Sequence, residues 1–357
     1  MKPKTIETNA TFRLNDLTSQ RAENACPVIG CRETTSVIGK HPVCPLHGLE
    51  IHKATFVYYN GASHAARTQA CLRNLLPFRK DFAAEHILDS SHKLEAHRLG
   101  HENSEDALTW NIFGGLLHYE RLHRVYNLLT SAQSSASQLA LFLWGIRIDF
   151  DSQAPELWPR LAEFRRSLEP DIDKFPTEPD IMLLGPTHLL CIEAKFCSGN
   201  PLAVDAEVKP GEKPKSRQGL MDRYLRGNKL WPTPAIKPED LGEVVHSQLL
   251  RNLVFASTVG QLEGRDWMVA NLVSKTQWKN GRKVYGYDFT DPTPSIPAVA
   301  QSRFKFISWE DEIYNRVLKD DPVLAELAEY MRTKTVNLKR AFRFMQRRQH
   351  ITLQMNT

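Results

Sequence analysis

The amino-acid sequence predicts an α/β fold in which helices surround a central sheet. The first observation behind this prediction is the segment 179–196, where two apolar strand-like runs are joined by a tight turn at Gly185-Pro186. The second is that stretches with a helical spacing of apolar residues stand on both sides of this hairpin, and further strand-like runs follow it.

Local patterns before the hairpin predict a short series of strands and helices. Ser104, followed by Glu105 and Asp106, is typical of a helix N-cap with acidic residues in the first turn. The elements expected here are a strand at 54–59, a helix at 65–76, a helix from 104 onward, a buried strand at 139–148 and an amphipathic helix at 155–166.

The region after the hairpin begins with residues 198–240, which are rich in Gly, Pro and Lys. This composition predicts a long loop inserted into the domain. The elements expected after it are a helix at 244–257, strands at 267–273 and 303–307, a helix at 309–318 and a final helical pair at 322–331 and 332–348.

The composition narrows the class of protein. No apolar run is long enough to span a bilayer, and the polar N-terminus lacks an apolar signal core, so we expect a cytoplasmic protein that does not enter membranes. The net charge of +5 permits an anionic partner without requiring one. Six cysteines in 357 residues do not suggest a disulfide scaffold, and clustered cysteines in a reducing compartment are more often metal ligands.

The hairpin carries side chains suited to phosphodiester chemistry. Asp180 opens its first strand, and Glu193 and Lys195 stand two residues apart near the end of its second, so both point to one face of the sheet. Carboxylates bind hard divalent cations, and such cations promote hydrolysis of phosphodiesters. The alternative is a surface salt bridge between Glu193 and Lys195, which the apolar setting of the strand disfavours.

The pattern Pro179-Asp180, twelve residues, then Glu193-Ala194-Lys195 resembles the signature of the PD-(D/E)XK nuclease superfamily. The resemblance covers at best residues 104–318. It implies a restriction-endonuclease-like core with a central mixed sheet flanked by helices, and a metal-dependent endonuclease acting on DNA. Asp180 and Glu193 would then bind Mg²⁺ or Mn²⁺ with the backbone carbonyl of Ala194. Lys195 would orient or activate the attacking water, or stabilise the charge of the transition state.

The same resemblance implies two further site residues on neighbouring helices. Members of the superfamily often contribute an acidic residue from a helix before the hairpin, which here would be Glu105. Some also place a glutamine on the helix after the lysine strand, which here would be Gln248. The alternatives are a plain helix-capping carboxylate for Glu105 and an ordinary surface side chain for Gln248.

A cysteine and histidine cluster near the N-terminus predicts a structural zinc site. Cys26 and Cys31 are followed after twelve residues by Cys44 and His47, a spacing that suits a tetrahedral Zn²⁺ ion. All four ligand positions are filled, which favours a structural role over a catalytic one. The segment resembles the small zinc modules of phage and bacterial DNA-processing proteins, although it could also staple a region that lacks a core of its own.

Basic residues gather in the predicted loop at 198–240 beside the active site. Such a cluster is what contacts with DNA phosphates require, and the alternative is a solvated loop. The candidate DNA-binding residues are Lys209, Lys213, Lys215, Arg217, Arg223, Arg226 and Lys229.

These interpretations divide the chain into four regions and suggest its partners. The regions are 1–50 with the zinc module, 51–103 as a connecting α/β segment, 104–320 as the nuclease core with its basic loop, and 321–357 as basic C-terminal helices.

The expected partners are DNA, a second copy of the chain because double-strand cutting usually needs two active sites, and other proteins of a restriction or anti-phage defence system. A substrate of RNA or branched DNA, and a catalytically inactive DNA-binding or assembly protein with the nuclease fold, remain as alternatives.

Overall fold

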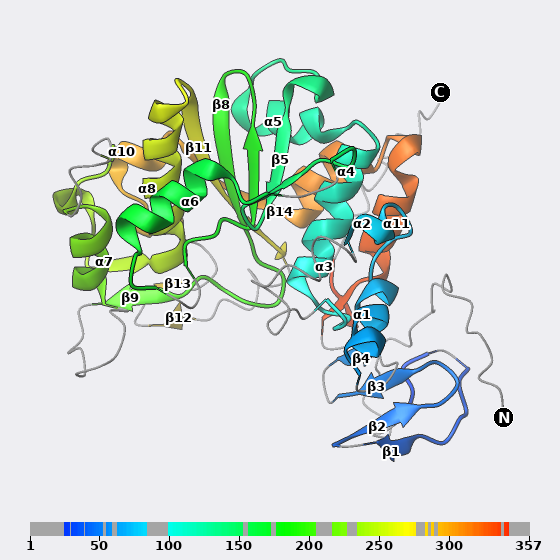
Figure 1. Cartoon of the computed structure of the whole chain (residues 1–357). Coiled ribbons are helices and arrows are strands. Elements are labelled where there is room, and N and C mark those ends of the chain that lie inside the picture. The colour runs from blue at the N-terminus through cyan, green and yellow to red at the C-terminus, as the bar shows by residue number, and fades with distance from the viewer. Residues whose placement is uncertain are drawn as a thin grey trace, which may run out of the picture.

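A six-stranded mixed sheet forms the centre of the computed structural model (Figure 1). Its strand order is β14-β11-β8-β7-β5-β6, with β14, β11 and β8 parallel and the remaining neighbours antiparallel. The strand bounds are β5 (Ala140–Leu143), β6 (Ile146–Ile148), β7 (Ile181–Leu184), β8 (His188–Ala194), β11 (Asp266–Val273) and β14 (Phe304–Ser308). The structure describes residues 25–28, 30–38, 40–52, 55–58, 63–83, 99–152, 156–172, 176–204, 216–226, 234–275, 283–284, 287–288, 292–336 and 339–342.

Helices cover both faces of this sheet, so the architecture has three layers. The side chains of β8 alternate between the two faces and are buried on both. Leu190 and Ile192 enter one apolar core, while Leu189 and Cys191 enter the other. The first core is covered by α3 (Glu105–Thr109), the π-helical turn Trp110–Gly114, α4 (Gly115–His118), α5 (Leu122–Thr130), the π-helix Trp309–Leu318 and α11 (Ala325–Thr333). The second is covered by α6 (Pro159–Leu168), α7 (Arg217–Tyr224) and α8 (Ser247–Leu262).

The turn of the central hairpin depends on a missing side chain. A Cβ atom at Gly185 would lie 2.3 Å from the ring of Tyr126, so only glycine allows α5 to approach this closely. The Tyr126 hydroxyl in turn accepts a hydrogen bond from the backbone N–H of His188 at 2.8 Å. The turn that was expected from the sequence therefore also docks α5 on the start of β8.

A small antiparallel sheet stands apart from the central one in the N-terminal region (Figure 1). Its apolar core is slight, with six buried residues, three of which are Cys26, Cys44 and Leu49. Arg73 of α1 holds it against the following helix by donating to the carbonyls of His47 and Gly48. The elements are β1 (Ser36–Ile38), β2 (His41–Cys44), β3 (Leu49–Ile51), β4 (Phe56–Tyr58), α1 (His64–Arg73) and α2 (Lys80–Phe82).

The remaining elements are short. Two-stranded antiparallel pairs are formed by β9 (Leu202–Val204) with β10 (Val244–His246), β12 (Lys283–Val284) with β13 (Tyr287–Asp288), and β15 (Thr335–Val336) with β16 (Lys339–Arg340). Single helical turns occur at Ala136–Gln138, Pro238–Asp240, Thr293–Ser295, Ala298–Gln301 (α10) and Pro322–Leu324.

Four expectations about secondary structure differ from the observed fold. The helix expected at 244–257 begins only at Ser247, because Val244–His246 form β10, which pairs with β9. The single strand expected at 139–148 is a hairpin, because Trp144 and Gly145 both adopt positive φ angles and reverse the chain between β5 and β6. The expected loop 198–240 contains β9 and α7, since Leu220, Met221 and Tyr224 bury an apolar face of α7. The helix expected at 332–348 is replaced over 335–340 by the pair β15 and β16, and Thr335 and Val336 are β-branched residues that favour strands.

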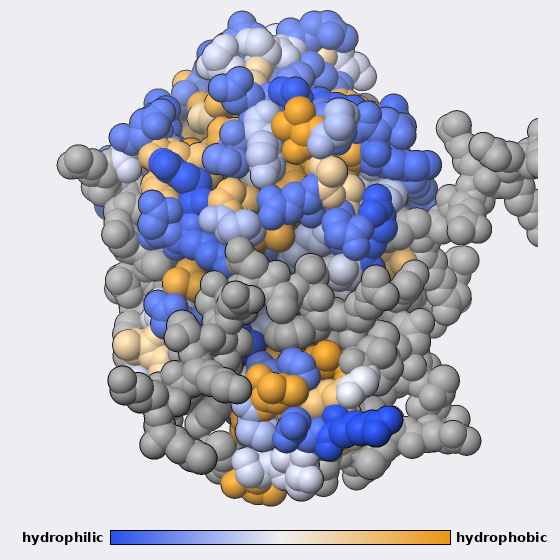
Figure 2. All heavy atoms as spheres, turned by 90° about the vertical axis from the view of Figure 1, so that its right-hand side faces the viewer, coloured by the Kyte–Doolittle hydropathy of each residue, from blue (hydrophilic) through white to orange (hydrophobic). Residues whose placement is uncertain are grey.

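None of the helices in the described ranges has both the length and the apolar character that a membrane crossing requires. Figure 2 shows one side of the molecule, where hydrophobic residues form small groups among hydrophilic ones. The most exposed large hydrophobic side chain in the described residues, Val37, belongs to the small N-terminal sheet.

Candidate active site and metal cluster

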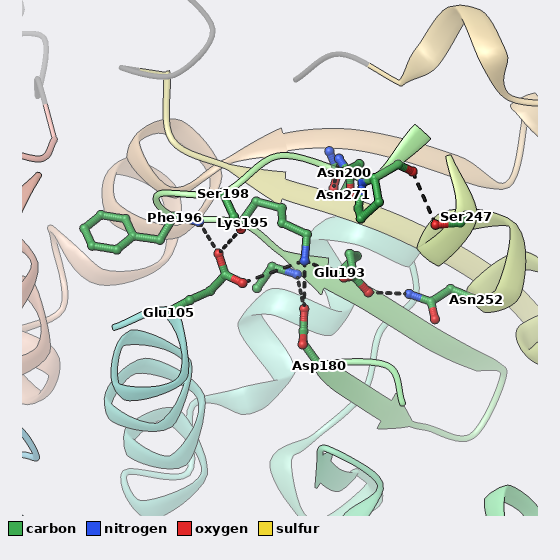
Figure 3. Close-up of polar contacts among 12 residues, drawn as sticks. Glu105, Asp180, Glu193, Lys195, Phe196, Ser198, Asn200, Ser247, Asn252 and Asn271 are labelled. Atoms are coloured by element: carbon green, nitrogen blue, oxygen red, sulfur yellow. Dashed lines mark hydrogen bonds and ion pairs between the residues drawn. The ribbon is translucent and has the colours of Figure 1, made fainter. Parts of the chain in front are cut away.

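The candidate active site lies at the end of β8, where the hairpin brings its polar residues together (Figure 3). Ile181 pairs with Ile192 across the hairpin, so Asp180, one residue earlier, stands opposite Glu193. Asp180 is fixed there because its carboxylate accepts a hydrogen bond from the backbone N–H of Ala194 at 2.9 Å. Glu193 and Lys195 point to the same face, as the spacing predicts, and their side chains are in contact.

Lys195 is the centre of a cluster of carboxylates. Its ammonium lies 2.6 Å from Glu193 Oε1, 3.7 Å from Glu105 Oε1 and 3.9 Å from Asp180 Oδ2. Its own backbone is held on both sides, because its N–H donates to Leu272 and its carbonyl accepts from the indole of Trp309. The lysine side chain is 5 % exposed. The strand end is therefore a rigid platform for these groups.

Glu105 reaches this cluster from the start of α3, on the opposite side of the sheet from α8 (Figure 3). Ser104 caps the helix by accepting a hydrogen bond from the N–H of Ala107, as the sequence predicts. The Glu105 carboxylate accepts from the Phe196 N–H at 2.6 Å and from the Ser198 hydroxyl at 3.0 Å. The structure thus brings the upstream acidic residue to the hairpin motif.

Asn252 is a member of the site that sequence reasoning missed. Its side-chain amide donates to Glu193 Oε2 at 2.8 Å, and the residue is 2 % exposed. Gln248, the residue expected from this helix, is partly buried one turn earlier on the same side of α8. The sequence does contain a signal for Asn252. It follows Gln248 by four residues, which places both side-chain amides on the same face of the helix.

Two further amides are buried next to Glu193. Asn271 on β11 is the Cα partner of Glu193, so the two side chains share a face of the sheet. Asn200 donates to Asn271 Oδ1 at 3.2 Å, and both residues are fully buried. In the described part of the chain, Asn200 Oδ1 and Asn271 Nδ2 have no hydrogen-bond partner. Unsatisfied buried polar atoms are rare, and here they stand beside the carboxylate cluster.

The surroundings raise the pKa values of two of the ionisable groups, for different reasons. Burial raises the pKa of Glu105, although the Lys195 ammonium and the Phe196 N–H act against this. Burial would lower the pKa of Lys195, but the carboxylates of Glu193, Glu105 and Asp180 outweigh it and hold that pKa above its ordinary value. Lys195 is therefore positively charged at neutral pH.

The donor set fits a hard divalent cation. The acidic side chains of Glu105, Asp180 and Glu193 offer only oxygen atoms, and they outnumber the single ammonium among them. Mg²⁺ and Mn²⁺ prefer carboxylate and carbonyl oxygens. The unsatisfied amide atoms of Asn200 and Asn271 are further buried polar groups beside this cluster.

The four side chains expected to bind zinc come together in the N-terminal region. Cys26 Sγ and Cys44 Sγ each lie 3.4 Å from His47 Nδ1, and Cys31 Sγ lies 3.8 Å from Cys44 Sγ. A tetrahedral Zn²⁺ ion with Zn–S near 2.3 Å and Zn–N near 2.0 Å separates its ligands by about 3.5 Å to 3.8 Å. All four ligand atoms lie within 4.8 Å of one another, so the cluster could hold zinc.

The surroundings shift the pKa values of two of the expected zinc ligands. Burial raises the pKa of the Cys26 thiol to about 12, and the neighbouring thiols of Cys44 and Cys31 act in the same direction. Thiolate is the form that binds metal, and a bound divalent cation compensates its charge. His47 is kept neutral, the form that coordinates metal, because burial and then Arg73 lower its pKa.

Of the seven basic residues expected to contact DNA, the described ones are Arg217 and Arg223 of α7 and Arg226, which follows the end of that helix. Arg223 donates to both carboxylate oxygens of Asp171 and to the carbonyl of Leu168, which ties α7 to the end of α6. Arg217 donates to the carbonyls of Leu241 and Gly242, and the exposed Arg226 pairs with Asp222. The other four, Lys209, Lys213, Lys215 and Lys229, lie outside the described residues.

Comparison with known proteins supports the relation to nucleases. Residues 46–334 match the model of a family described as restriction endonuclease associating with ARP. The match includes every carboxylate and amide of the cluster at β8, whereas of the four cysteine and histidine ligands it includes only His47. No curated protein and no solved structure matches the chain.

Proposed function

This chain belongs to the family of restriction endonucleases associating with ARP, and from that premise we propose that it is a metal-dependent endonuclease that hydrolyses phosphodiester bonds in DNA. The observation that carries the proposal is the convergence of Asp180, Glu193, Lys195 and Glu105 at the end of β8. These residues come from separate segments of the chain, so a chance surface ion pair does not account for them.

In this proposal the acidic residues hold the cation and the lysine acts on the phosphate. Asp180 and Glu193, with the carbonyl of Ala194, would hold Mg²⁺ or Mn²⁺, which when bound supplies an activated water and neutralises charge on the phosphate. Glu105 completes the acidic surroundings from α3. Asn252 positions Glu193 by its hydrogen bond, so the carboxylate keeps one orientation.

The charge state of Lys195 favours one of its two expected roles. A proton acceptor must be neutral, whereas the carboxylates around Lys195 keep its ammonium protonated. A protonated lysine held by the strand end can instead orient the attacking water and stabilise the negative charge that develops on the phosphate. We therefore assign Lys195 an electrostatic role.

Contacts to DNA are assigned to the basic residues of 198–240. The segment leaves directly from the Lys195 strand, so its charges lie next to the site along the chain. Arg226 is the exposed member and follows the end of α7, whereas Arg223 is committed to Asp171 and would act mainly by positioning the helix. The zinc module would stabilise the N-terminal region, with Zn²⁺ in a structural role.

The family's description also bears on partners. It names an association with ARP, and we propose that this chain works with a partner protein, in restriction or anti-phage defence. A homodimer would supply the two active sites that double-strand cutting requires.

The test is cleavage of plasmid and single-stranded DNA by the purified protein with Mg²⁺ or Mn²⁺, beside EDTA and the Lys195→Ala variant. Metal-dependent cutting by the wild type that the variant lacks would support the proposal. Cutting that survives in EDTA or in the variant would refute the site. If RNA or branched DNA is cut in place of duplex DNA, the substrate assignment changes but the site does not. DNA binding without cleavage would instead favour a non-catalytic protein that keeps the nuclease fold.

A further inference from the structure

We propose that His41, Glu50 and His52 form a second metal site in the N-terminal sheet, separate from the cysteine cluster, which binds a divalent transition-metal ion of the Zn²⁺ class. One ligand atom from each of the three residues lies within 4.8 Å of the other two. The proposal concerns the small sheet alone and does not depend on the function assigned to the β8 site.

Strand pairing places the two clusters on opposite faces of this sheet. Val43 of β2 pairs with Glu50 of β3, so His41, two residues before Val43, and His52, two residues after Glu50, share their face. Cys44 pairs with Leu49, and these two enter the small apolar core on the other face. The two sets of ligands therefore cannot serve one ion.

The contacts within the second cluster bring a third side chain to one ion pair. His52 Nε2 lies 2.9 Å from Glu50 Oε1, which one histidine and one carboxylate would explain. The ring of His41 lies with its centroid 4.0 Å from that of His52, so a second imidazole meets the same carboxylate region. Two imidazoles and one carboxylate around one point are the donors of a metal site, since imidazole supplies nitrogen and glutamate supplies the charge.

The donor set also indicates which ions would bind and how. Imidazole and carboxylate together suit Zn²⁺, Co²⁺ or Ni²⁺, whereas Mg²⁺ takes oxygen ligands almost alone. Three protein ligands leave one tetrahedral position for water, unlike the cysteine cluster with its four ligands. All three residues are partly exposed, so the ion can enter from solvent, and we expect weaker binding than at the buried thiols.

The test is a Co²⁺ titration of the chelator-treated full-length protein in excess Mg²⁺, which occupies hard oxygen sites. Filling the cysteine cluster gives a thiolate-to-cobalt charge-transfer band. We expect a second step that adds visible ligand-field absorption without further charge transfer. His52→Ala and Glu50→Gln should each lose this second step and keep the first. In parallel, the Zn²⁺ content of these two variants, measured by elemental mass spectrometry, should be one ion per chain lower than that of the wild type.

The first step reports folding of the module in the same sample, so a misfolded variant cannot imitate the expected result. His101→Ala is the matched control, because its ring lies 6.2 Å from that of His52 but outside the cluster, and both steps should remain. A wild type with one step only, or a second step that survives both substitutions, would overturn the proposal. If Glu50→Gln loses the second step but His52→Ala keeps it, His52 is not a ligand and the proposal also fails.

Discussion

The end of β8 and the N-terminal sheet both gather side chains of the kinds that bind metal ions, but they hold them by different means. At β8 the carboxylates and Lys195 stand on a six-stranded sheet with an apolar core on each face. In the N-terminal sheet the ligands Cys26 and Cys44 are themselves part of a core of six buried residues. The large sheet carries its polar side chains on a core that they do not form, whereas in the small sheet the candidate ligands are part of the core.

Because of this difference, losing a candidate ligand should have different consequences in the two regions. A site on a sheet that is stable by itself can lose a polar group and stay folded, because the buried apolar area is unchanged. A region with little apolar core gains much of its stability from the bound ion, about 10–16 kcal/mol for zinc in small finger domains. Substitutions at β8 should therefore change activity, and those in the N-terminal cluster should change stability.

The largest effect is expected from Glu193→Gln. The change removes a carboxylate from a site with an excess of acidic groups, and Lys195 keeps Glu105 and Asp180 as partners. We expect cleavage to fall by at least about 10²–10³-fold, as when one electrostatic group of an active site is removed. Cleavage and thermal unfolding should be measured on the same preparations. Wild-type cleavage would remove Glu193 from the site, and unfolding of the variant would contradict the comparison between the two regions.

The second effect is expected from Cys44→Ser in the N-terminal cluster. Loss of a buried thiolate should lower the zinc content and expose the backbone of β2 and β3 to hydrogen exchange. The Mg²⁺ dependence of cleavage should stay as in the wild type, because the β8 site does not share these ligands. Cys71→Ser, outside the cluster, is the control and should keep its zinc. Equal zinc content in both variants would show that Cys44 is not a ligand.

A smaller effect is expected when a positioning residue is removed. Asn252→Ala leaves Glu193 Oε2 without its amide donor, so the affinity for Mg²⁺ measured from cleavage should fall by about 10–100-fold. Gln248→Ala, one turn earlier on α8, is the matched variant. A larger loss in Gln248→Ala than in Asn252→Ala would favour the glutamine that the sequence suggested.

The smallest effect concerns pH and Glu105. Since burial raises its pKa, the folded protein binds this proton more tightly than the unfolded chain. The contribution of Glu105 to the free energy of unfolding is thus greatest at acidic pH and declines as the pH rises through that raised pKa. The glutamine of Glu105→Gln cannot ionise. The thermal stability of this variant should therefore decline less than that of the wild type as the pH rises through the raised pKa. DNA cleavage by the variant should also rise less with pH than cleavage by the wild type. An unchanged stability profile, with Glu163→Gln as a surface control, would contradict this origin of the shift.

Short-range patterns were sufficient for much of the fold. The hairpin at 179–196, the cap at Ser104, the strands near 267–273 and 303–307 and the helix at 309–318 follow from turns, caps and apolar spacing, and all are present. The predictions at 139–148, 198–240, 244–257 and 332–348 differ from the structure. A positive φ decided the first, the buried apolar face of α7 the second, and short strand pairs the last two. Those depend on what the segment packs against, which composition does not reveal.

The sequence by itself determined the residue types of both candidate metal-binding clusters. The spacings Asp180 to Glu193-Ala194-Lys195 and Cys26 to His47 are local, and the chemistry limits which side chains can serve. Only the tertiary structure decided that Glu105 meets Lys195, that Asn252 donates to Glu193, and that His41 shares a face with Glu50 and His52. The physical reason is that contacts between distant segments are fixed by how helices pack on sheets and how strands align, and neither is written in the spacing along one segment.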